Sequence, residues 1–143
     1  MEFSEIELRR GAAVHEAGHA IVAWTLGLKV PQLRIGEDGK GASCIEYSAH
    51  LPILDQIAIA AAGMEAVELL HAPTWDLAGV TDAAKIDDLL DACPDQRERL
   101  TRRGHERARE VIACRLTILA DLADALALSG FLDATALIPF TRS

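Results

Sequence analysis

The sequence predicts an α+β domain that is mainly α-helical and carries one small β-hairpin or sheet. Two observations predict the helices: Ala and Leu, both strong helix formers, dominate the composition, and apolar residues recur at helical spacing along most of the chain. The hairpin is predicted by a glycine-rich turn at 36–41 that separates two short segments of different composition. The 143 residues have the usual length of one domain, so we expect a single domain, 1–143.

The first predicted helix covers residues 5–26. Ser4 precedes it and Glu7 comes three residues later, which is the sequence pattern of a capping box. Apolar residues within the segment fall at helical spacing and imply one buried face. Gly27 supplies a stop signal at the C-terminal end of the helix.

The predicted hairpin pairs residues 29–35 with residues 42–48. Both segments carry β-branched or aromatic residues, and the turn between them is rich in glycine. Pro31 suits an edge position or the first residues of a strand. We therefore expect a small sheet that follows the first helix directly.

The rest of the chain is predicted to form a helical C-terminal half. Helices are expected over 52–71, from a cap at Thr81 or Asp82 to about 92, over 95–128 and over 132–138. Pro94 and Gly130 separate the later helices. Gly104 is a point at which the long 95–128 segment can be interrupted.

Charge and composition exclude several classes of protein. The net charge of −8 argues against a nucleic-acid partner, because such proteins are usually basic. The three cysteines, Cys44, Cys93 and Cys114, form no C-x-x-C pair and are expected to be reduced thiols of a cytoplasmic protein. No signal-peptide pattern opens the chain, and the most apolar stretch, 57–64, is too short to span a bilayer. We therefore expect no membrane insertion.

Six arginines lie close together in this acidic chain. They are Arg97, Arg99, Arg102, Arg103, Arg107 and Arg109. Such a stretch can dock nucleic acid or an acidic partner. Because glutamates are interleaved with the arginines, we expect instead a solvated helix face with ion pairs.

Residues 15–19 form the motif H-E-x-x-H inside the first predicted helix. His15 and His19 are four residues apart and lie on one helix face, where two imidazoles can bind one metal ion. Zn²⁺ accepts such ligands and can leave a coordination position open for water. Glu16 is expected to act as the general base that takes a proton from this water. The alternative is two ordinary histidines with Glu16 in a helical ion pair.

The chain also resembles a known family. Residues 15–24, H-E-A-G-H-A-I-V-A-W, closely resemble the zinc helix in the peptidase domain of FtsH-type ATP-dependent proteases. Residues 61–68 and 79–82 loosely resemble the small-residue helix and the ligand-bearing segment that follow it in that family, and 118–122 resembles part of its closing hairpin. The resemblance implies an aspartate as third zinc ligand. No P-loop pattern is present, so we expect a stand-alone peptidase domain without the ATPase module.

Asp82 is the predicted third ligand, because it lies at the predicted first turn of a helix within the segment 79–82. It can also serve only to cap that helix. We expect Glu65 or Glu68 to hydrogen-bond a zinc-bound imidazole or to form a solvated ion pair. The rivals of Asp82 as third ligand are Glu65, Glu68, Asp76 and His71.

These features together predict a zinc metallopeptidase, with His15, His19 and Asp82 holding Zn²⁺ and Glu16 as catalytic residue. The expected substrate is a short peptide, an unstructured protein segment, or a protein presented by a partner chain. Residues 42–48 would offer a strand edge for it. The oligomeric state stays open, including a homo-oligomer. Two alternatives are a catalytically inactive metal-binding regulatory domain and a helical interaction module without metal.

Overall fold

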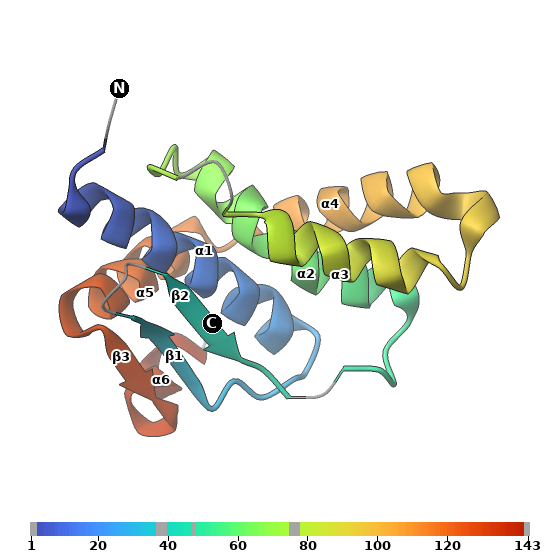
Figure 1. Ribbon diagram of the computed structural model, residues 1–143. Coiled ribbons are helices and arrows are strands. Elements are labelled where there is room, and N and C mark those ends of the chain that lie inside the picture. Colours follow the sequence, from blue (N-terminus) through green and yellow to red (C-terminus); the bar gives the residue numbers. More distant parts are fainter. Residues whose placement is uncertain (1–2, 37–39, 47, 75–77, 142–143) are drawn as a thin grey trace.

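The computed structural model describes residues 3–36, 40–46, 48–74 and 78–141. Within these residues the protein is mainly helical and contains a small three-stranded antiparallel sheet, which confirms the predicted fold class (Figure 1). The elements in chain order are α1 (Glu5–Thr25), β1 (Gln32–Ile35), β2 (Gly41–Cys44), α2 (Ile53–Leu69), α3 (Val80–Leu90), a short 3₁₀ helix η1 (Pro94–Gln96), α4 (Arg97–Ala113), α5 (Leu116–Ser129), β3 (Phe131–Asp133) and α6 (Ala134–Thr141).

Helix α1 lies at the centre of the molecule, with α2 on one side and α5 and the sheet on the other (Figure 1). The capping box is confirmed: the Glu7 backbone N–H donates to the Ser4 hydroxyl at 3.2 Å, and the Ser4 backbone N–H donates to the Glu7 carboxylate at 3.1 Å. Every residue from 11 to 23 is buried. The expectation of one buried face is therefore too narrow, because neighbouring elements cover this part of α1 from several directions.

The sheet has the strand order β2-β1-β3, and both pairings are antiparallel. The predicted hairpin is confirmed with shorter strands, and Leu33 in β1 faces Ser43 in β2. Strand β3 corrects the prediction of a helix over 132–138, because Leu132 pairs with Leu33 and the helix begins only at Ala134. Leu132 is buried there, so tertiary packing decides the conformation of this short segment.

The predicted long helix over 95–128 is two helices, α4 and α5. The chain turns at Cys114 and Arg115 rather than at Gly104, which lies buried inside α4. A Cβ atom at Gly104 would lie 2.3 Å from Cγ2 of Ile57 in α2. Gly104 therefore allows α4 to approach α2 closely and does not end a helix.

Four arginines of α4, namely Arg97, Arg102, Arg107 and Arg109, form ion pairs, as the sequence predicts for this helix face. Arg107 Nε lies 3.2 Å from the Asp55 carboxylate of α2, and Arg97 Nη1 lies 2.7 Å from the Asp87 carboxylate of α3. Arg102 pairs with Glu106 on α4 itself. These contacts tie α4 to its neighbours and occupy much of its positive charge.

Two further expectations concern the cysteines and the membrane. All three cysteines are free thiols. Among the helices within the described ranges, none combines the length and the apolar character that crossing a bilayer requires.

Candidate metal centre

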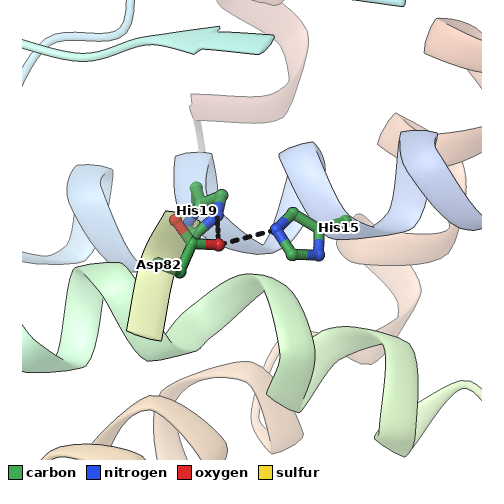
Figure 2. A group of neighbouring side chains, drawn as sticks. All are labelled: His15, His19 and Asp82. Atoms are coloured by element: carbon green, nitrogen blue, oxygen red, sulfur yellow. Dashed lines mark hydrogen bonds and ion pairs between the residues drawn. The ribbon is translucent and has the colours of Figure 1, made fainter. Parts of the chain in front are cut away.

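The two histidines of the H-E-x-x-H motif lie one turn apart on α1 and point toward the same place (Figure 2). Their ring centroids are 4.8 Å apart and the rings meet edge to face, with an interplanar angle of 72°. His15 is 8% exposed and His19 is 6% exposed. Two nearly buried imidazoles are costly to desolvate unless their nitrogens find partners.

Asp82 supplies the partner for both rings. It lies in the first turn of α3, and its Oδ2 atom is 2.8 Å from His15 Nε2 and 3.1 Å from His19 Nε2 (Figure 2). One potential ligand atom from each of the three residues lies within 4.8 Å of the others. The three side chains therefore form a buried group that can bind a metal ion.

The hydrogen bonds of His19 suit a metal ligand. Its Nδ1 lies 2.7 Å from the carbonyl oxygen of Ile59 in α2. A carbonyl only accepts, so Nδ1 carries a proton and Nε2 is the atom left to bind a cation. Metal-binding histidines in proteins are commonly oriented by such a bond at their other ring nitrogen.

His15 differs from His19, because its Nδ1 is buried and finds no hydrogen-bond partner within the described part of the chain. Its Nε2 points to Asp82. Among the described residues, the contacts that orient this ring are therefore packing contacts and the bond at Nε2.

The electrostatics of the group favour a cation between the rings and the carboxylate. Burial opposes ionisation of Asp82, but hydrogen bonds from His15 and His19 outweigh burial and hold the pKa of the carboxyl well below its usual range. Burial also opposes protonation of His19, but the hydrogen bond and charge of Asp82 outweigh it and raise the pKa of the imidazole. The group thus binds a proton firmly, and a metal ion is the cation that can replace it.

Glu16 lies beside this group without joining it. Its side chain is buried, although charged residues are rarely so, and it contacts Gly41 at the start of β2. His15, Glu16, His19 and Asp82 all line one cavity of about 750 Å³. This volume is within the usual range for a small-molecule site.

The cavity is bounded by α1, β2, α2 and α3. Strand β2 contributes Gly41 and Ser43, and the residue that follows the strand, Ile45, also lines the cavity. Because β2 is one of the two outer strands of the described sheet, the cavity runs beside a sheet edge. Lys85, one turn after Asp82 on α3, lies at the same cavity.

The rivals of Asp82 lie elsewhere or outside the described residues. Glu65 is buried on α2 but pairs with Arg109 at 3.4 Å and with His105 at 3.6 Å, both from α4. Glu68 also pairs with Arg109, at 3.7 Å. Both glutamates therefore form ion pairs: the pair of Glu68 is solvated as expected, whereas Glu65 is buried.

His71 and Asp76 are the other two candidates for the third ligand. His71 is exposed at the end of α2 and does not line the cavity. Asp76 lies outside the described residues.

Sequence reasoning did not identify three neighbours of the histidines and Glu16. They are the carbonyl of Ile59 and the glycines Gly63 and Gly41. The sequence did contain a signal for Gly63. It is the only glycine in the Ala- and Ile-rich α2, where a poor helix former indicates that something packs closely at this position. No sequence pattern points to a main-chain carbonyl such as that of Ile59.

Comparison with known proteins adds no relative: no protein-family model matches the chain, and no curated protein matches it. The fold and the site thus define the class by themselves. This is a mainly helical α+β domain with a buried group of two histidines and one aspartate that can bind a metal ion.

Proposed function

We propose that the protein is a zinc-dependent metallopeptidase that hydrolyses peptide bonds with metal-activated water. One observation carries the proposal: His15, His19 and Asp82 converge in a cavity of about 750 Å³ that Glu16 also lines. Two imidazole nitrogens and one carboxylate oxygen are a ligand set that catalytic zinc uses, with the fourth position left to water. The resemblance of residues 15–24 to the zinc helix of FtsH-type peptidases supports the same activity.

Bound zinc would lower the pKa of a water molecule toward neutrality. With zinc held by His15, His19 and Asp82, Glu16 would take one proton from a water molecule as the water oxygen attacks the carbonyl carbon of the peptide bond. Glu16 then passes this proton to the amine nitrogen as the carbon–nitrogen bond breaks. The second proton of the water also ends on the amine, so the products are a carboxylate and an ammonium group, and Glu16 returns to its starting state.

The position of Glu16 supports this role. It follows His15 directly in α1, so its carboxylate lies beside the metal-binding group rather than within it. It also faces the cavity from beneath β2. A base in this place shares the cavity in which the metal, water and substrate would meet.

The substrate is an extended peptide or an unstructured protein segment. Strand β2 is paired on one side only, with β1, within the described sheet. An extended chain can add to such an edge through main-chain hydrogen bonds, which require little of the substrate's sequence. A folded protein would have to be presented in unfolded form by a partner chain.

The test measures metal content and hydrolysis with the same preparations. We expect about one zinc ion per wild-type chain, cleavage of unfolded casein, and loss of both in His19→Ala and Asp82→Ala. If Asp82→Ala keeps its zinc while His19→Ala loses it, Asp82 is not the third ligand.

The same measurements separate the alternative functions. Zinc without cleavage of casein or of a mixed peptide library would indicate a metal-binding regulatory domain. No zinc in wild-type protein, even after reconstitution, would refute the proposal and favour an interaction module without metal.

A further inference from the structure

Gly63 brings the main chain of α2 against the ring of His15. A Cβ atom at this position would lie 2.5 Å from Nε2, 2.6 Å from Cδ2 and 2.7 Å from Cε1 of His15. Non-bonded heavy atoms do not approach so closely, because contacts between carbon atoms are most favourable at about 3.5–4.0 Å. Any residue other than glycine at position 63 would therefore displace the imidazole or separate α1 from α2.

The orientation of the His15 ring depends on packing more than the orientation of the His19 ring does. The ring of His19 is oriented by the Ile59 carbonyl, whereas Nδ1 of His15 has no hydrogen-bond partner within the described residues. A ring without such a bond can rotate about its side-chain torsions unless packing prevents it. The surface of α2 at Gly63 and the edge of the His19 ring provide that packing.

Gly41 makes a similar contact with Glu16. A Cβ atom at Gly41 would lie 2.5 Å from Cγ, 3.0 Å from Cδ and 2.9 Å from Oε2 of Glu16. The first residue of β2 therefore lies directly against the carboxylate. Without a side chain at this position, β2 can cover Glu16 and still leave the carboxylate at the cavity.

We propose that Gly63 and Gly41 are positioning residues, Gly63 for the metal ligand His15 and Gly41 for the general base Glu16. Neither touches the reacting atoms, and each acts through the side chain that it contacts. This inference rests on the proposed zinc peptidase function. It also predicts two separable defects, because one glycine contacts a metal ligand and the other contacts only the base.

Gly63→Ala is tested against Gly104→Ala. Both variants add a methyl group to close helix packing, but the group at position 104 meets Ile57 rather than a metal ligand. We expect Gly63→Ala to bind zinc about 10- to 100-fold more weakly than wild type and to change the visible absorption bands of the Co²⁺-substituted protein. Gly104→Ala keeps wild-type zinc affinity and the wild-type Co²⁺ spectrum, with a lowered melting temperature.

Gly41→Ala is tested against Arg34→Ala, a change at an exposed position in the neighbouring strand β1 that does not line the cavity. We expect Gly41→Ala to keep its zinc affinity while kcat for peptide hydrolysis falls about 100-fold and KM changes little. Arg34→Ala keeps the wild-type kcat and KM.

A measurement on the wild-type protein covers the case in which Gly63→Ala does not fold. Proton NMR of the metal-free and zinc-loaded protein should show strong cross-relaxation between the Gly63 α-protons and the His15 ring protons in both states. Absence of that signal in the zinc-loaded protein would overturn the role of Gly63.

The other outcomes separate the role of Gly63, the role of Gly41 and the proposed function. Unchanged zinc affinity and Co²⁺ spectrum in Gly63→Ala, or equal weakening in Gly104→Ala, overturns the role of Gly63 while the proposed function stands. Unchanged kcat in Gly41→Ala overturns the role of Gly41 alone. A wild-type protein that binds no zinc overturns both the inference and the proposed function.

Discussion

A cluster of histidine and carboxylate side chains lies on each of two sides of helix α2. The two clusters differ in the positive charge that surrounds the carboxylate. Toward α1 and α3, His15, His19 and Asp82 converge without an arginine among them. Toward α4, Glu65 meets His105 and also Arg109. The arginine supplies a permanent positive charge to the second group, whereas in the first group the Asp82 carboxylate meets the imidazoles of His15 and His19. The comparison teaches that a buried histidine–carboxylate group is available to a metal ion when no arginine already occupies it.

The largest expected effect is on the rate of peptide hydrolysis, and it should differ between the two buried glutamates, Glu16 and Glu65. Glu16→Gln should lower the rate of peptide hydrolysis by about 10²–10⁴-fold, because glutamine cannot accept the proton of water, and should keep zinc. Glu65→Gln should leave both zinc content and hydrolysis at wild-type levels. Steady-state kinetics with metal analysis of the same samples checks this. Equal losses in the two variants would mean that the two sides of α2 are not functionally distinct.

Metal removal should lower the melting temperature of those variants that keep the metal ligands on α1 and α3. Zinc at about 100 times its dissociation constant stabilises a folded protein by about 2.7 kcal/mol. Chelation should therefore lower the melting temperature of wild-type protein by roughly 10 °C. The melting temperature of Asp82→Asn should not respond to the chelator, whereas that of Asp55→Asn should respond as wild type does. Differential scanning fluorimetry gives all of these values, and a wild-type curve that ignores the chelator contradicts the prediction.

A smaller effect is expected where Asp55 meets Arg107 between α2 and α4. Asp55 is largely buried and Arg107 is partly exposed, so removing the pair with Asp55→Asn should cost about 1 kcal/mol of unfolding free energy. Zinc affinity should not change. Urea unfolding of the zinc-loaded protein measures the first quantity, and a chelator competition measures the second. Weakened zinc binding would show that the α4 side also supports the metal-binding group.

The smallest effect is expected on the outer face of α4. Arg102 and Glu106 form an exposed pair one turn apart. Such pairs contribute about 0.3–0.5 kcal/mol, and salt screens them. Arg102→Ala should therefore unfold within about 0.5 kcal/mol of wild type, and the difference should vanish at 1 M salt. A larger loss in the same urea titration would indicate a structural role that the exposed pair does not explain.

Local sequence signals predicted most of the fold and much of the metal-binding group. The capping box at Ser4 and the helical spacing of His15 and His19 depend on neighbours in the chain, so short-range rules describe them. Asp82 was inferred from its place in a segment that resembles a family motif, and it does lie with both histidines.

Features set by long-range packing could not be predicted. The strand at Leu132 exists because β1 offers a free edge more than ninety residues earlier in the chain, and no local propensity encodes that pairing. Gly104 was interpreted as a point of interruption because a glycine in a helix usually signals weakness. Its contact with Ile57 becomes visible only when α2 and α4 are seen together.

The separation of the three potential ligands along the chain has a consequence for folding. His15 and His19 lie on one helix, but the contact between His15 and Asp82 spans 67 residues. Closing a loop of that length costs entropy before any ligand bond can repay it. A growing or partly folded chain would hold only two imidazoles, so full metal affinity arises only after α3 has docked. Binding of Co²⁺, which absorbs visible light, followed in time during refolding would therefore report when α3 docks against α1.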